Sequence, residues 1–207
     1  MTTAKAETLH DVSSQPSQSL IAWLGFACMA AALLSGILKG LWELSHPILN
    51  DTHTLAFAPP AQLWAYGILE VIKSAGFLAG LYGFYLCATK RGLVVKIFMG
   101  LAVLGGLFFA VVWMWIAVTT RFTLVYVLGG MWYQMIAPVA LGVAALFARR
   151  ISWWGAAWAI VVGVLNSQIF ALLGVGQAMV VQGVIWLAFG WVVYSLRVVP
   201  NYRGTNL

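Results

Sequence analysis

The stretch Leu69–Gly80, LEVIKSAGFLAG, places two charges inside a long apolar segment. That segment extends from about Ala61 to Ala88, which is long enough to cross a lipid bilayer as a helix. Glu70 and Lys73 stand three residues apart within it, and a charge at the bilayer centre costs ~2.5–3.5 kcal/mol on insertion scales. Such a pair therefore indicates either a contact that holds helices together or a site that binds a ligand.

The composition of the whole chain agrees with a membrane-spanning fold. Hydrophobic residues make up 63% of the 207 positions and charged residues only 8%. A water-soluble domain of this size needs far more charge to cover its surface. The chain is therefore predicted to be an all-α, polytopic integral membrane protein.

Six apolar runs have the length of a spanning helix. They are Leu20–Leu44, Ala61–Ala88, Leu93–Val118, Thr123–Phe147, Trp153–Leu173 and Gln177–Leu196. We expect one transmembrane domain over residues 20–197, with an outer loop at 45–60. Residues 1–19 are expected to form a disordered cytoplasmic tail, and residues 198–207 a second cytoplasmic tail.

The basic residues predict the orientation of these helices. If the six spans alternate in direction, eight Lys and Arg residues fall on one side and Arg121 alone falls on the other. The eight are Lys5, Lys90, Arg91, Lys96, Arg149, Arg150, Arg197 and Arg203. Cytoplasmic loops carry the excess of Lys and Arg, so both termini are predicted to be cytoplasmic. The expected location is the cell membrane, as in a bacterial inner membrane.

Tryptophans are expected to mark the two faces of the membrane. Trp23, Trp153, Trp154 and Trp158 are assigned to the inner interface, and Trp42, Trp64, Trp113 and Trp115 to the outer one. Trp132, Trp186 and Trp191 stand deeper in their spans, where we expect them to pack inside the bundle.

Polar residues within the spans gather in the outer half. Lys73 is placed near the midplane, with Glu70 outward of it on the same helix face. Intramembrane polar groups need partners because lipid offers none. One interpretation is a set of structural hydrogen bonds and an ion pair of Glu70 with Lys73 or Lys39. The other is an outward-facing polar pocket, whose candidate ligand-binding residues are Glu70, Lys73, Tyr66, Gln134, Asn166, Gln168, Gln182 and Lys39.

The first outer loop and the end of the span before it offer a second set of polar side chains. Glu43, His46, Asp51 and His53 carry oxygen and nitrogen atoms of the kind that bind divalent metals. Glu43 and His46 have the spacing of one helical face. The set matches no metal-binding motif, however, so a solvated loop is the preferred interpretation and no metal site is predicted.

Several function classes are disfavoured by what the sequence lacks. All three histidines lie outside the predicted spans, which argues against a bis-histidine haem. Glu70 is taken as the only acid within the membrane, which argues against two-carboxylate chemistry. We find no nucleotide-binding, zinc-protease or serine-hydrolase motif, so no cofactor is expected. The basic residues are spread over several loops, and nucleic acid is not an expected partner.

Three functions remain open. The first is the binding or transport of a small or lipid-like molecule through the polar pocket around Glu70. The second is a non-catalytic subunit or assembly factor of a larger membrane complex, and the third is an intramembrane enzyme that uses Glu70 as general acid or base. The expected partners are membrane lipids, a small amphipathic ligand, and either a membrane-protein partner or further copies of the chain.

Overall fold

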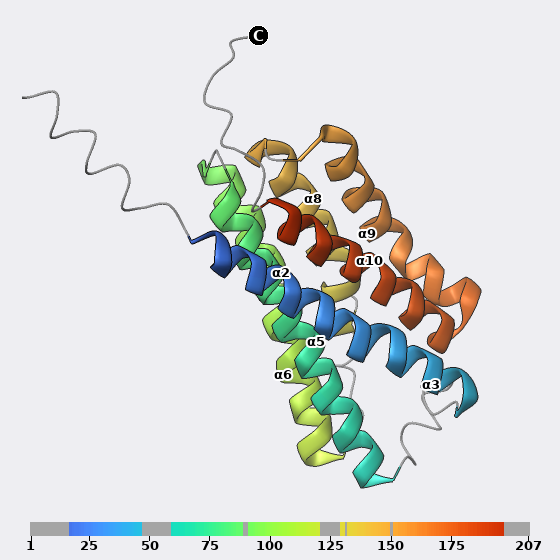
Figure 1. Cartoon of the computed structure of the whole chain (residues 1–207). Helices are drawn as coiled ribbons and strands as arrows, with labels where there is room; N and C mark the ends of the chain where they lie inside the picture. Colours follow the sequence, from blue (N-terminus) through green and yellow to red (C-terminus); the bar gives the residue numbers. More distant parts are fainter. Residues whose placement is uncertain are drawn as a thin grey trace, which may run out of the picture.

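The computed structural model is helical throughout the residues that it describes (Figure 1). These are residues 17–46, 59–88, 91–120, 129–130, 132–149 and 151–196, with only the backbone considered for 166–171. Six helices are formed there. The first runs without a break from Gln18 to Ser45 and comprises α2 (Gln18–Ala32), η1 (Leu33–Leu38) and α3 (Lys39–Ser45). The others are α5 (Pro60–Cys87), α6 (Leu93–Thr119), η2–α8 (Trp132–Ile136 and Ala137–Ala148), α9 (Trp153–Leu173) and α10 (Val175–Leu196).

Four of the six helices are long and apolar enough to cross a membrane. They are the first helix, α5, α6 and α10, with mean hydropathies of 2.1, 1.3, 2.4 and 1.7. The value is lowest for α5 because this helix carries Glu70 and Lys73. The observed ends differ from the predicted spans by at most two residues for these four helices, and α9 has the predicted bounds.

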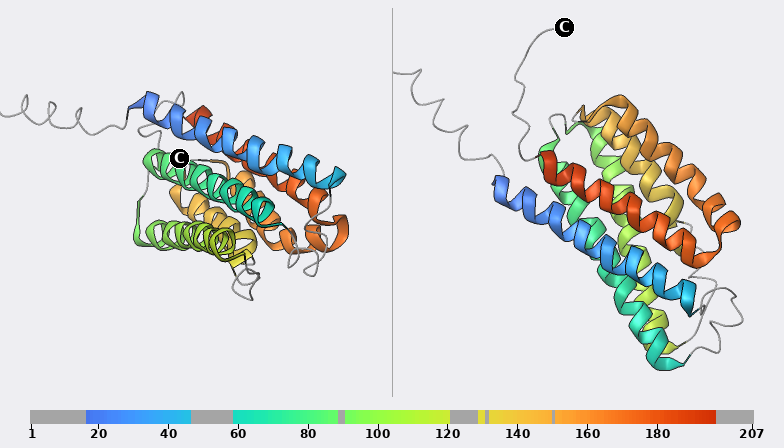
Figure 2. Two further views of the ribbon diagram at one scale, coloured as in Figure 1. Left: turned by 90° about the horizontal axis from the view of Figure 1, so that it is seen from below. Right: turned by 45° about the vertical axis from the view of Figure 1, so that its right-hand side comes forward.

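Successive helices alternate in direction, so that the bundle has two distinct ends (Figure 1). Ser45, Pro60, Thr119 and Val175 lie at one end, called here the Ser45 end. Gln18, Cys87, Leu93, Ala148 and Leu196 lie at the other, called the Cys87 end. Figure 2 shows that the first helix runs beside α10 along most of its length.

Glycines allow the first helix and α10 to approach closely. A Cβ at Gly25, at Gly40 or at Gly190 would lie within 3.0 Å of backbone atoms of the opposite helix. Gly36 packs on Gly183 in the same way, and Gly176 packs on Gly40. These six residues form a glycine seam between the first and last helices. Small residues at an interface let helices pack closely in lipid, where no hydrophobic force drives them together.

Two π-helical turns interrupt the regular helices. The first, η1, stands in the middle of the first helix just before Lys39, and the second, η2, leads into α8. Pro138 stands in the first turn of α8, directly after η2. Proline has no backbone N–H, so it removes one hydrogen bond of the regular helix, and the wider turn is found next to it.

Two tryptophans differ from the prediction in whether they are buried or exposed. Trp113 was assigned to the outer interface but is fully buried, because its side chain points into the bundle beside Lys39. Trp191 was expected inside the bundle but is 59% exposed. Trp186 is buried, as predicted. The tryptophans that are exposed are Trp23, Trp42, Trp64, Trp115, Trp153, Trp154 and Trp158.

Candidate functional site

Five polar residues meet between the first helix and α5. Lys39 and Glu43 are one turn apart on α3, and Tyr66, Glu70 and Lys73 follow one face of α5. The two faces meet through the contacts of Lys39 with Glu70 and of Glu43 with Tyr66. None of the five side chains is more than about 5% exposed. We call these residues the charge cluster.

Glu70 is the centre of the charge cluster. Lys39 donates a hydrogen bond to one of its carboxylate oxygens, Oε1. Lys73 forms an ion pair with the other oxygen, Oε2. Sequence analysis left open whether Lys39 or Lys73 is the partner of Glu70. In the structure both lysines form an ion pair with it.

Glu43 is the second acid of the charge cluster. Its Oε2 accepts a hydrogen bond from the Tyr66 hydroxyl, and its side chain is 1% exposed. The prediction that Glu70 is the only acid among the spanning helices is therefore wrong. The spacing to Lys39 was the available signal, since residues four apart share a helix face.

Aromatic rings surround the two ammonium groups. The Nζ atom of Lys39 lies 4.5 Å from the ring centre of Tyr66 and 5.3 Å from that of Trp113. The Nζ atom of Lys73 lies 5.0 Å from the ring centre of Phe109 and 5.7 Å from that of Tyr133. The negative faces of aromatic rings attract cations, and this attraction replaces part of the hydration that burial removes.

An aromatic layer closes the charge cluster toward the Cys87 end. It consists of Phe77, Phe109, Tyr133 and Trp186. Phe77 stands one turn beyond Lys73 on α5, and its ring centre is 4.6 Å from that of Trp186 and 5.4 Å from that of Tyr133. Phe109 and Tyr133 stack at 4.4 Å. The layer joins α5, α6, η2 and α10 at a single level of the bundle.

Three buried hydroxyl groups near the charge cluster have no hydrogen-bond partner among the described residues. They belong to Ser35, Ser74 and Tyr133, all fully buried. Ser35 precedes Lys39 by one turn, and Ser74 follows Glu70 by one turn, so both hydroxyls belong to the faces that form the charge cluster. A buried hydroxyl without a partner costs ~1–3 kcal/mol, so a polar group or a water that bonded to one of these three would be stabilised there.

The structure brings four of the eight predicted ligand-binding residues together, namely Lys39, Tyr66, Glu70 and Lys73. Gln182 is buried on α10 one turn before Trp186, at the level of the aromatic layer. Gln134 is half-buried in η2 beside Tyr133. Asn166 and Gln168 belong to α9, and their side chains lie outside the described part of the chain.

The four residues considered as metal ligands do not form one group, because the first helix ends at Ser45, between Glu43 and His46. Glu43 points into the bundle, whereas His46 is exposed, stacks on Trp42 at 5.1 Å and lies 2.9 Å from the Ser45 hydroxyl. The expectation that Glu43 and His46 share a face is wrong, because α3 ends at Ser45. Asp51 and His53 lie outside the described residues. No group of three or more potential metal ligands occurs within residues 17–46, 59–88 and the other described ranges.

The arrangement presents both signs of charge in a buried site. Two carboxylates and two ammonium groups balance one another within the charge cluster. In such a site, the carboxylate or the ammonium group of a ligand can replace one partner of an internal ion pair. Comparison with protein-family models, curated proteins and solved structures finds no match for this chain.

Proposed function

We propose that the chain is a multi-pass protein of the cell membrane, with six spanning helices and both termini in the cytoplasm. Four apolar helices of sufficient length support membrane insertion. The exposed basic residues of the described chain support the orientation. Arg91, Lys96 and Arg149 all stand at the Cys87 end, which becomes the cytoplasmic end under the positive-inside rule.

Within this membrane protein, the charge cluster binds a small zwitterionic or amphipathic molecule that enters from the Ser45 end, for retention or for transport. The observation that carries this proposal is the burial of both signs of charge beside hydroxyl groups that have no partner among the described residues. Glu70 lies about 15 Å from the start of α5 at 1.5 Å per residue, on the Ser45 side of the aromatic layer. The aromatic layer provides a floor that separates the site from the cytoplasmic half.

Binding is better supported than intramembrane catalysis. A general acid or base needs an oxygen directed at a substrate, and each carboxylate oxygen of Glu70 faces a lysine. Binding is also better supported than a role as a complex subunit. The polar groups lie inside the bundle, whereas a subunit interface would place its distinguishing residues on the outer surface.

The unpartnered hydroxyls allow binding to be tested separately from folding. Tyr133→Phe and Ser74→Ala each remove a hydroxyl that has no hydrogen-bond partner among the described residues. Neither variant should lose stability, because each removes a buried polar group that costs free energy. If a ligand supplies the missing hydrogen bonds, both variants should lose the thermal stabilisation that the ligand gives to the wild-type protein.

The experiment measures thermal unfolding in detergent with a panel of amino acids and betaines at millimolar concentration. Native mass spectrometry of gently purified protein is the second readout. Tyr82→Phe serves as the control, because Tyr82 is 52% exposed and outside the charge cluster. We expect a stabilising zwitterion for the wild type and for Tyr82→Phe, with a reduced effect for the two site variants. An equal response of all four proteins, or no response in any, would contradict binding at this site.

A further inference from the structure

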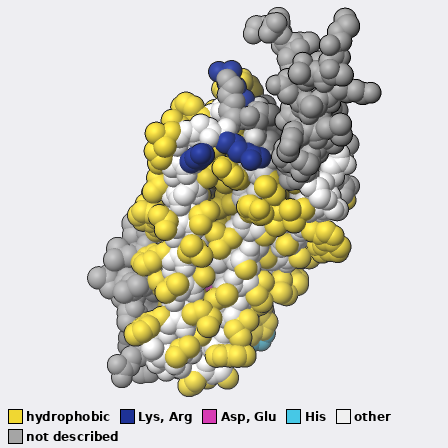
Figure 3. Space-filling model, turned by 90° about the vertical axis from the view of Figure 1, so that its left-hand side faces the viewer, with side chains coloured by type: hydrophobic (Ala, Val, Ile, Leu, Met, Phe, Trp, Pro, Cys, Tyr) yellow, Lys and Arg dark blue, Asp and Glu magenta, His cyan; other side chains and the backbone are white. Residues whose placement is uncertain are grey.

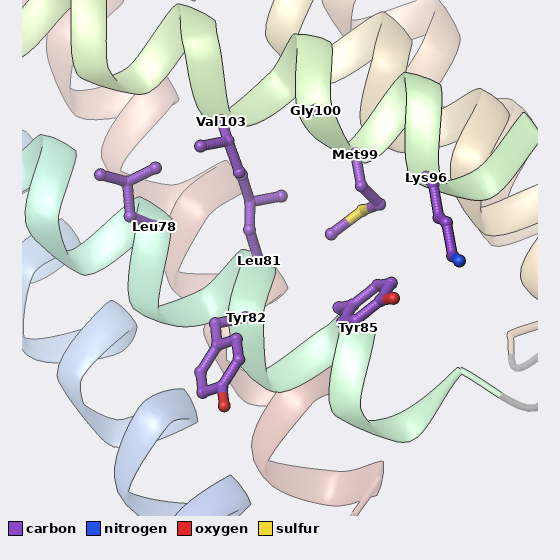
Figure 4. A pocket seen from close by; sticks show the side chains of 8 residues that line it. All are labelled: Leu78, Leu81, Tyr82, Tyr85, Lys96, Met99, Gly100 and Val103. Carbon is purple, nitrogen blue, oxygen red and sulfur yellow. The ribbon is translucent and has the colours of Figure 1, made fainter. Parts of the chain in front are cut away.

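A groove between α5 and α6 lies apart from the charge cluster, toward the Cys87 end. It has a volume of about 450 Å³. Its apolar walls are formed by Leu78, Leu81, Met99 and Val103. Gly100 stands in the wall from α6, and a Cβ there would meet nothing within 4 Å, so the absence of a side chain leaves this part of the groove open. Figure 4 shows these residues on the facing sides of the two helices.

One end of the groove is polar and basic. Lys96 from α6 and Tyr85 from α5 line it, and Figure 4 shows the Tyr85 hydroxyl on the side of the Lys96 ammonium group. The guanidinium of Arg91 lies 5.1 Å from the centre of the Tyr85 ring and donates to the carbonyl oxygen of Leu86. Two exposed cations therefore flank the end of the groove where α5 ends and α6 begins.

No acidic side chain balances these cations within the described chain. Its two acids, Glu43 and Glu70, are both buried in the charge cluster. Figure 3 shows Lys and Arg side chains gathered at one end of a face that is otherwise largely apolar. An occupant of the groove thus meets an apolar channel followed by uncompensated positive charge.

We infer that this groove binds one anionic phospholipid. An acyl chain lies along Leu81, Met99 and Val103, and the phosphate is held at Lys96 and Arg91. The groove extends over eight residues of each helix, about 10 Å along the axis, which accommodates part of one acyl chain. Basic residues at the cytoplasmic ends of spanning helices attract anionic head groups. The inference rests on the proposed membrane location but not on a ligand at the charge cluster.

The test is native mass spectrometry of the full chain in detergent with equal amounts of phosphatidylglycerol and phosphatidylcholine. We expect the wild type to retain one phosphatidylglycerol under activation that removes phosphatidylcholine. Lys96→Gln should lower this retention about fivefold, the factor that one cation contributes at an anionic lipid surface. Gly100→Leu should abolish retention of phosphatidylglycerol, because its Cβ enters open space and the rest of the side chain occupies volume in the groove.

Two matched controls separate the groove from the general lipid coat. Arg149→Asn removes an exposed cation at the same end, and asparagine tolerates the left-handed backbone there, where φ is 50°. Val111→Phe adds bulk to α6 at a position that is 64% exposed and outside the groove. Both should retain phosphatidylglycerol as the wild type does. Equal retention of the two lipids, or losses in the controls that equal those of Lys96→Gln and Gly100→Leu, would overturn the inference. Failure of this test leaves the charge-cluster proposal intact, because that proposal has its own variants.

Discussion

Lys39 and Glu70 form a buried ion pair across 31 positions of the chain, and the pair joins the first helix to α5. Lys73 holds the other carboxylate oxygen. Removal of Glu70 therefore leaves two buried ammonium groups without their anion. We expect Glu70→Gln to lower the free energy of unfolding by ~3–5 kcal/mol, the range for a broken buried ion pair. Lys39→Met and Lys73→Met should each cost less, because Glu70 keeps one cation.

Removal of a matched pair should restore part of this loss. Glu70→Gln combined with Lys73→Met leaves Lys39 and Glu43, which are of opposite charge and share one face of α3. This double variant should be more stable than Glu70→Gln alone. Unfolding of the single and double variants by a denaturing detergent measures the coupling. Losses that simply add would show that Glu70 and Lys73 are not energetically paired.

The hydrogen bond between Tyr66 and Glu43 gives a second prediction. Tyr66→Phe keeps the aromatic ring next to Lys39 but removes the hydroxyl that donates the hydrogen bond to Glu43. We expect a loss of ~1.5–3 kcal/mol, the range for a hydrogen bond to a charged group. Tyr82→Phe removes an exposed hydroxyl and should change stability by less than ~0.5 kcal/mol. A similar small effect of both substitutions in the same unfolding assay would argue against the bond.

The helices could be predicted from sequence because their signal is local. An apolar run of about 20 residues, ended by proline, glycine or charged residues, determines where a spanning helix begins and ends. This is why α5 and α9 were predicted to within one residue. The clustering of Lys39, Tyr66, Glu70 and Lys73 could be predicted as well, from depth along the helix and from shared faces.

The remaining features depend on which helices become neighbours, and a single sequence does not carry that information. Trp113 looks like an interface residue by its position in α6, yet it faces Lys39 because α6 packs on α5. Glu43 stands at the end of a span, where a loop residue was equally reasonable. The glycine seam was missed because its members come from the first and last helices, and their pairing is a property of the bundle.

The glycine seam leads to a third prediction. A Cβ at Gly183 would lie 2.7 Å from the backbone nitrogen of Ile37 and 2.9 Å from the carbonyl carbon of Gly36. Gly183→Ala should therefore separate α10 from the first helix and cost ~1–3 kcal/mol, as overpacking does. Gly100→Ala is the control, since nothing lies within 4 Å of its added methyl group. It should be neutral or slightly stabilising, because alanine favours helix over glycine. Equal stability of the two variants in thermal unfolding would contradict close packing at the seam.

The orientation in the membrane gives the last prediction. His46 is exposed at the Ser45 end, and Gly92 is exposed at the Cys87 end with open space around it. The native Cys28 and Cys87 are only 2% and 8% exposed and can be replaced by alanine to give a background without thiols. A cysteine introduced at His46 should react with a membrane-impermeant maleimide in intact cells, since the Ser45 end is proposed to face outward. A cysteine introduced at Gly92 should react only after the cells are permeabilised, because the positive-inside rule assigns the basic Cys87 end to the cytoplasm. Labelling of Gly92→Cys in intact cells, with His46→Cys protected, would reverse the proposed topology and move the charge cluster to the cytoplasmic half.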